Sequence, residues 1–234
     1  MTELRVYCRN GVYTQDTSIS NKVKSIIVDE SCKKLGTYSL GLTFLENVTL
    51  PNTLIEIEDD AFHSTKISKI FIPKSVTILH PNNPFNYMPY LERIDVDQKN
   101  LNFASNNGIL FSKNFDHLIH YPMQIKSPIY KAPPTVRYIN PYAFHAHAYI
   151  ETIVFHDKIL EMREGSFWKT QKLKRIMIPY NFSQPKLLKD AFLESSFIFP
   201  DNVMFYAYIK ETCIFIRDSI SYRFEISLIF LIIS

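Results

Sequence analysis

Glycine is scarce in this sequence. Only five of the 234 residues are glycine, where roughly 7% is usual. Loops that cradle phosphate groups need several glycines at fixed spacing, because their backbone must approach the phosphate closely. The composition therefore leaves almost no room for a glycine-rich nucleotide-binding loop.

Cysteine is sparse as well, and the three residues Cys8, Cys32 and Cys213 lie far apart. Because no C-x-x-C pair is present, a zinc ribbon and a thioredoxin-type redox site are excluded. An odd number of cysteines at this spacing also excludes a framework of several disulfides. One bridge remains possible.

Long apolar runs and a strong charge are also missing. No run reaches the ~18–20 apolar residues that span a bilayer, so no transmembrane segment is expected. The first seven residues include Glu3 and no apolar stretch, and they do not form a recognisable signal peptide. The net charge is only +3 and the basic residues do not cluster, which argues against a nucleic-acid partner.

The sequence contains an internal repeat instead. Apolar residues recur 3, 5, 9 and 12 positions after Val23, Leu45 and Ile67, and a small residue followed by a large apolar one comes 16 and 17 positions after the first two. In the third copy the aromatic arrives one residue late, as Phe85. Further copies start near Leu91, Ser127, Ile150 and Leu173, and a degraded copy consists of Phe197, Phe199, Pro200 and Val203.

Each copy has the pattern of one coil of a solenoid. Offsets 3 and 5 differ by two, the period of a β-strand, so both side chains point into a core. A proline at offset 6 ends that strand, since it cannot donate a ladder hydrogen bond. Stacked coils bury the edges that one coil leaves exposed. We therefore predict a repeat solenoid of about seven coils, with short parallel strands and mostly irregular or short helical returns.

The pattern L-x-x-I-x-I-P-x-x-V-x-x-I-x-x-x-A-F resembles the BspA-type leucine-rich repeats of surface antigens, over roughly residues 23–203. The resemblance implies a non-catalytic protein that binds a protein or a host or matrix surface, exposed on the cell surface or secreted. The missing signal peptide favours the alternative, an intracellular leucine-rich-repeat scaffold in the cytoplasm. The family's glycine at offset 13 survives only as Gly36, which indicates turns of a different build.

The repeat also suggests how the chain is organised. We expect an N-terminal cap or partial coil at 1–22, the solenoid at 23–205, and a degenerate cap or tail at 206–234. The tail is expected to be a capping strand, a truncated anchor or sequence without a selected role. An insert at about 97–126 contains apolar runs at 108–111 and 118–121 around a polar turn, which predicts a β-hairpin. We interpret it as a variant of one coil rather than a binding arm.

Catalytic and metal-binding patterns are weak. His145 and His147 could share a metal, but a solvated loop between coils is the better interpretation. His117 and His120 are three apart on a predicted strand and should face opposite ways. The acidic residues at 56–60 are interpreted as a solvated turn. We therefore expect no enzyme activity, no cofactor and no metal.

The residues between the inward strand positions, at offsets 2 and 4, should form a continuous outward face. There, cations border exposed apolar residues, a composition suited to protein binding, although a plain solvated sheet is the alternative. The candidate binding residues are Lys69, Phe71, Arg93, Lys131, Val154, Arg175 and Met177. Asn47 and Asn181 stand in N-x-[ST] sequons and are candidates for glycosylation.

Overall fold

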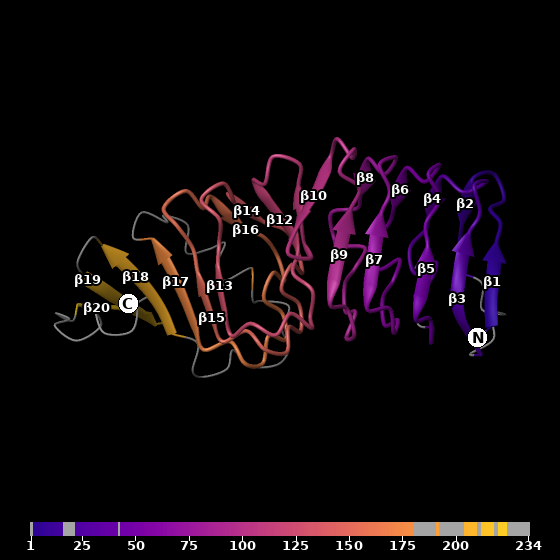
Figure 1. Ribbon diagram of the computed structural model, residues 1–234. Helices are drawn as coiled ribbons and strands as arrows, with labels where there is room; N and C mark the ends of the chain where they lie inside the picture. The colour runs from indigo at the N-terminus through magenta and orange to yellow at the C-terminus, as the bar shows by residue number, and fades with distance from the viewer. Residues whose placement is uncertain are drawn as a thin grey trace.

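The protein forms an elongated stack of β-coils, with the N-terminus at one end (Figure 1). The computed structural model describes residues 2–15, 22–41, 43–179 and 191, together with the backbone of three strands at 204–209, 212–217 and 220–223. Among the described residues, no helix is long and apolar enough to cross a membrane.

One row of parallel strands runs along the stack, and we call it the first strand row. Its register follows the repeat, since Ser25 pairs with Asn47, Lys69 with Arg93, and Thr152 with Arg175. The row comprises β1 (Thr2–Val6), β3 (Val23–Val28), β5 (Asn47–Thr49), β7 (Lys69–Ile72), β9 (Arg93–Val96), β13 (Ile129–Lys131), β15 (Thr152–Val154) and β17 (Arg175–Pro179).

A second strand row lies across the core from the first and consists mainly of two-residue strands at offsets 11 and 12 of the described regular coils. They are also parallel, as the pairing of Leu35 with Ile57 and of Ile139 with Met162 shows. The returns between strands are turns, and no helix forms in the described part of residues 2–179. The row comprises β2 (Val12–Tyr13), β4 (Lys34–Leu35), β6 (Glu56–Ile57), β8 (Ile78–Leu79), β14 (Tyr138–Ile139) and β16 (Glu161–Met162).

A column of aromatic rings fills the core between coils, where the repeat places its large apolar residue. Phe62 stacks on Phe85 at 5.7 Å between ring centroids, and Phe144 stacks on Phe167 at 5.4 Å. All four rings are buried. The predicted register is therefore confirmed, including the late aromatic of the third copy.

In the regularly spaced coils, the turn that precedes the large apolar residue has its left-handed residue at offset 15, and it needs no glycine at offset 13. Positive φ angles occur two positions later, at Tyr38, Asp60 and Tyr142. Only Gly165 is a glycine at this position, and a Cβ there would lie 2.6 Å from the Tyr142 ring. Because the turn places its left-handed residue at offset 15, residues other than glycine can occupy offset 13.

The insert forms three antiparallel strands: β10 (Phe103–Asn106), β11 (Ile109–Ser112) and β12 (His117–His120). The predicted hairpin is β11 with β12, and sequence reasoning missed β10. β12 then pairs in parallel with β14, so the insert supplies a strand to the second strand row.

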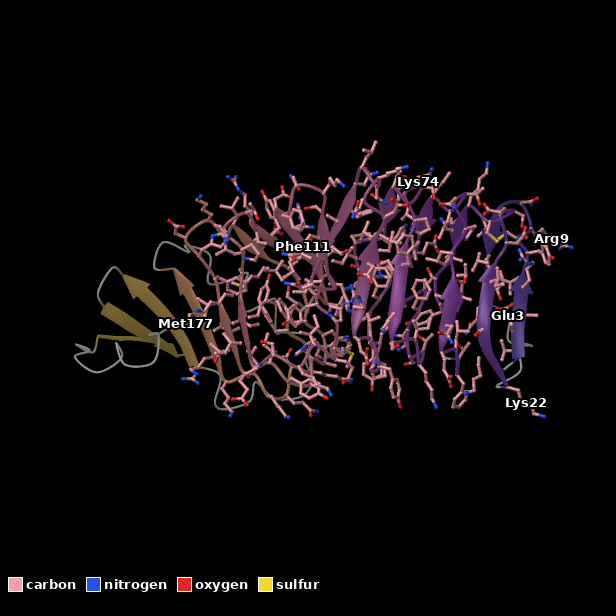
Figure 2. The ribbon with its side chains drawn as sticks, in the orientation of Figure 1. Glu3, Arg9, Lys22, Lys74, Phe111 and Met177 are labelled. Carbon is pink, nitrogen blue, oxygen red and sulfur yellow. A yellow bond between two sulfur atoms is a disulfide. The ribbon has the colours of Figure 1, made fainter. Side chains whose placement is uncertain are left out.

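The insert is an internal wall rather than an arm. Leu110 and Ile119 pack into the core of the N-terminal coils, whereas Phe111 and Leu118 pack into that of the C-terminal coils. Figure 2 shows Phe111 in the middle of the stack. The two faces of one hairpin thus join two hydrophobic clusters, in agreement with our interpretation of the insert as a variant coil.

Strands at both ends of the chain extend the stack. Strands β1 and β2 pair with β3 and β4, so residues 2–13 supply both strands of a coil. At the other end, β18 (Met204–Ile209) pairs with β17, followed by antiparallel β19 (Thr212–Arg217) and β20 (Ile220–Arg223). The strand next to β17 therefore begins at Met204, while the predicted copy containing Phe197, Phe199, Pro200 and Val203 lies outside the described residues.

A disulfide between Cys8 and Cys32 joins the first two coils, with the Cα atoms 5.0 Å apart. The bridge closes a loop across a sequence separation of 24 residues. Because such a link removes freedom from the unfolded chain, we expect Cys8→Ser to lower the free energy of unfolding by about 3 kcal/mol. Urea denaturation with and without a reductant measures this loss.

The control for the disulfide prediction is Cys213→Ser, which keeps both bridge cysteines. Reductant should destabilise this variant as much as the unmodified chain, and Cys8→Ser should no longer respond to it. An equal response of Cys8→Ser and the unmodified chain to reductant would contradict the assignment of the bridge.

Candidate binding face

The strand face is the outward surface of the first strand row, formed by the residues at offsets 2 and 4. The alternation of β7 places Lys69 and Phe71 in solvent and buries Ile70 and Ile72 between them. Phe71 is 55% exposed. Of the other predicted residues, Arg93, Lys131 and Arg175 are exposed, and Val154 and Met177 are half-buried.

Some of the cations on and beside this face have an ion-pair partner, and others have none. Arg93 contacts Asp95 on its own strand at 2.5 Å, which offsets its charge. Just before the strands, at offset 1, Lys174 donates to Glu151 at 2.9 Å, and this hydrogen bond is the main reason that the pKa of Glu151 is lowered. Lys69, Lys131 and Arg175 are exposed and make no ion pair with any described residue, so they are the cations most available to a ligand.

The strand face is split rather than continuous, contrary to the sequence prediction. The backbone N–H of Ile94 donates to the carbonyl of Gly108 at 2.9 Å, so the insert pairs where the next coil would. A Cβ on Gly108 would lie 2.6 Å from Arg93 Cβ, so this approach requires glycine. The insert therefore separates the half with Lys69 and Phe71 from the half with Lys131.

His145 and His147 do not lie in a solvated loop, and that interpretation was wrong. Both side chains are buried. The His147 Nδ1 accepts hydrogen bonds from the backbone N–H groups of Tyr149 and Ile150, at 3.3 and 3.0 Å. The His145 Nδ1 contacts the Asn86 Oδ1 atom, which is an acceptor, so this nitrogen carries the proton. Both imidazoles hold turns together.

Sequence reasoning missed that His120 lies near them in the same core. Its Nδ1 accepts from the Asn83 amide at 2.9 Å. Burial lowers the pKa of His120 to about 3 and those of His145 and His147 to about 4, because the charged imidazolium loses its hydration. All three are neutral at pH 7, and they do not bring three ligand atoms within metal-binding distance.

His117 points the other way along the same strand, as predicted. Its ring stacks on Tyr138 at 4.4 Å, and its Nδ1 contacts the Asn140 Oδ1 at 3.0 Å. It is half-buried while His120 is buried. The alternation of β12 thus excludes a metal shared between these two histidines.

The acidic residues at 56–60 are not simply solvated, which corrects the second loop interpretation. Lys34 contacts Glu56 at 3.0 Å and Glu58 at 2.5 Å, and these side chains are only partly exposed. The hydrogen bond from Lys34 is the main cause that lowers the pKa of Glu58 to about 2. His80 adds a contact to Glu56 at 3.2 Å. The cluster therefore links three successive coils.

Among the described residues, Glu56, Glu58 and His80 are the group whose ligand atoms could surround a metal, lying within 4.8 Å of one another. The Lys34 ammonium already bonds both carboxylates and supplies the positive charge there. Of the glycosylation candidates, Asn47 is exposed on β5, and its amide lies 3.4 Å from the Ser25 hydroxyl. Asn181 lies outside the described residues.

Solved structures of bacterial leucine-rich-repeat proteins have the same fold. The pneumococcal vaccine antigen PcpA is 27% identical, with a TM-score of 0.63, over 68% of this chain and 42% of its own. A leucine-rich repeat protein from Eubacterium ventriosum is 22% identical, with a TM-score of 0.62, over 76% and 54%. A leucine rich cell surface protein from Faecalibacterium prausnitzii is 21% identical, with a TM-score of 0.52, over 73% and 58%.

The chain thus spans about half the length of these solved relatives, and no curated protein sequence matches it. The family model described as BspA type leucine rich repeat region matches residues 17–124 and 120–198 with six copies. These matches include the coils that carry the strand face. The chain therefore belongs to the BspA-type leucine-rich-repeat family.

Proposed function

We propose that this protein is a non-catalytic binding protein that acts outside the cell and holds a protein ligand on the strand face. The observation that carries the proposal is the exposed Phe71 beside Lys69, whose ammonium makes no ion pair with described residues. An aromatic side chain beside a cation is a composition enriched at protein interfaces. The likeness to a pneumococcal vaccine antigen supports the same role.

The Cys8–Cys32 disulfide supports the extracellular alternative over the intracellular scaffold. Disulfides persist in oxidising compartments and are rare where glutathione keeps thiols reduced. The bridge joins the first two coils, and Cys32 is fully buried among core residues. A bridge in this position is a structural one, which favours folding in an oxidising environment.

Charge reversal tests the strand face. The variant Lys69→Glu, Arg93→Glu, Arg175→Glu should lose binding to immobilised extracellular-matrix proteins, measured by surface plasmon resonance. All three side chains are exposed, so the melting temperature and the far-UV circular dichroism should stay unchanged. The expected loss is at least about tenfold in affinity, because reversed charges repel the acidic surface that cations attract.

The matched control reverses three exposed lysines away from the strand face: Lys33→Glu, Lys74→Glu and Lys99→Glu. It changes the net charge by the same amount and should keep binding. Equal loss in both variants would show an effect of net charge alone. Retention of binding by the strand-face variant would show that the ligand is held elsewhere.

A further inference from the structure

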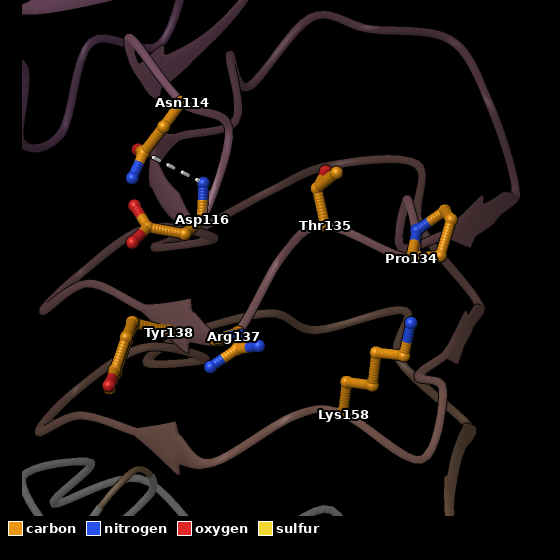
Figure 3. A pocket seen from close by; sticks show the side chains of 7 residues that line it. All are labelled: Asn114, Asp116, Pro134, Thr135, Arg137, Tyr138 and Lys158. Atoms are coloured by element: carbon orange, nitrogen blue, oxygen red, sulfur yellow. Dashed lines mark hydrogen bonds between the residues drawn. The ribbon is translucent and has the colours of Figure 1, made fainter.

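A hollow of about 420 Å³ opens beside the second strand row, where the insert meets the next coil (Figure 3). The hollow is shallow and open to solvent rather than enclosed. Asn114 and Asp116 come from the turn of the insert, and Lys158 comes from a later coil, across the hollow from Asn114. The remaining lining residues are Pro134, Thr135, Arg137 and Tyr138.

The hollow exists because the insert does not match the solenoid. In the coil that begins at Leu45, the hydroxyl at offset 8 bonds the preceding coil, since Thr53 donates to the carbonyls of Glu30 and Cys32, at 2.8 and 3.0 Å. Thr135 occupies the same offset in its coil, but its neighbour in the stack is the turn of the insert instead of a regular coil. Its hydroxyl makes no hydrogen bond to any described residue and lines the hollow instead.

The hollow has cations on one side and a carboxylate on the other. Arg137 and Lys158 are exposed cations that form no ion pair with described residues. Opposite them, Asp116 Oδ1 accepts a hydrogen bond from the Ser112 hydroxyl at 2.7 Å. Desolvation alone would raise the pKa of Asp116, but this hydrogen bond and that of Asn114 outweigh it and lower the pKa. Asp116 is therefore an ionised acceptor at pH 7.

Tyr138 lines the hollow, and two other side chains contact its ring. His117 stacks on it at 4.4 Å, and the Arg163 guanidinium lies 5.9 Å from its centroid. A side chain that already has such contacts costs less ordering entropy when a ligand binds. The hollow thus offers two cations, a carboxylate acceptor, an unused hydroxyl and a fixed aromatic residue.

We propose that this hollow binds an acidic sugar, with the sugar carboxylate on Arg137 and the sugar hydroxyls on Asp116, Asn114 and Thr135. The two cations, Arg137 and Lys158, outweigh the single negative charge of Asp116. The hollow therefore carries a net positive charge, which selects an anionic ligand. Arginine is suited to carboxylates because its planar guanidinium can donate two parallel hydrogen bonds. Asp116 repels a second acidic group, so a single carboxylate beside several hydroxyls fits best. This site is independent of the strand face.

The test uses the full chain with D-glucuronic acid as the probe and D-glucose as the neutral match. Saturation-transfer NMR should show ring protons of glucuronic acid in contact with the protein, and no such signal from glucose. Titration calorimetry should show binding at least about tenfold weaker in Arg137→Ala, since a charge-assisted hydrogen bond is lost. Asp116→Asn should also weaken binding of the sugar.

The control variant is Lys33→Ala, because Lys33 occupies the offset of Arg137 in a coil without an insert. It should bind glucuronic acid as the unmodified chain does. Inorganic sulfate competing as strongly as glucuronic acid, with Asp116→Asn unchanged, would show a bare anion site and overturn the proposal. Equal signals from glucose and glucuronic acid, or full binding by Arg137→Ala, would also overturn it.

Discussion

The variant Phe144→Ala should lose roughly 3–5 kcal/mol of unfolding free energy, as large-to-small changes of fully buried phenylalanines do. Phe144 is completely buried. Its ring stacks on Phe167 and Tyr121, with centroids 5.4 and 5.0 Å away, and packs against Tyr130. Removing it leaves a cavity in the middle of the aromatic column. Urea denaturation followed by circular dichroism measures the loss.

The matched control for Phe144→Ala is Phe71→Ala, which removes the same atoms from an exposed position on the strand face. We expect a change within about 0.5 kcal/mol there. Phe62→Ala, in the other half of the column, should behave like Phe144→Ala. Equal and small losses at Phe144 and Phe71 would mean that the rings do not stack in the core and that the register is wrong.

Acid should destabilise this fold from about pH 6.5 downward, before most carboxylates are protonated. The folded pKa values of His120, His145 and His147 lie at about 3, 4 and 4, below the unfolded value of 6.5. A lowered histidine pKa means that the unfolded chain binds the proton more tightly. The stability is therefore complete above pH 6.5 and decreases as the pH falls toward 4.

Each of these histidines contributes a slope of up to about 1.4 kcal/mol per pH unit between its two pKa values. Denaturation curves between pH 7.5 and 4.5 measure the combined slope. The variant His145→Gln should show a smaller slope than the unmodified chain, whatever its stability at pH 7.5. A free energy of unfolding that stays constant from pH 7 to 5 would contradict the buried, neutral state of these side chains.

Glu58 affects the free energy of unfolding in a different pH range from the histidines, so the two contributions can be told apart. Its pKa is lowered to about 2, mainly by the hydrogen bond from Lys34. A lowered carboxylate pKa contributes stability above the unfolded value of 4.5, and that contribution is lost as the pH falls from 4.5 toward 2. Loss of stability between pH 6.5 and 4.5 therefore reports on the histidines and not on this ion pair.

Local sequence patterns were sufficient to predict the coil register. The period-two positions placed Ile70 and Ile72 inside and Lys69 and Phe71 outside, as the structure has them. This success has a physical cause, since every coil repeats the same contacts and the pattern is read several times along one chain. The aromatic at offset 17 was predictable for the same reason.

The features that sequence reasoning missed depend on contacts between distant residues. The partner of His145 is Asn86, 59 positions away, and nothing in the local pattern of His145 and His147 indicates burial. The Cys8–Cys32 pairing depends on the stacking of the first coil, whose residues showed only partial strand character. Likewise, the division of the strand face follows from the pairing of Gly108 with Ile94.

Surface digestion of intact source cells tests the central proposal most directly. Added protease should remove the protein from intact cells, and thiol alkylation before reduction should leave Cys8 and Cys32 unmodified because they are joined. That result would agree with a disulfide-linked BspA-type solenoid that presents its strand face outside the cell. Full protection of the protein in intact cells, with both cysteines alkylated, would contradict the proposal and favour the intracellular scaffold.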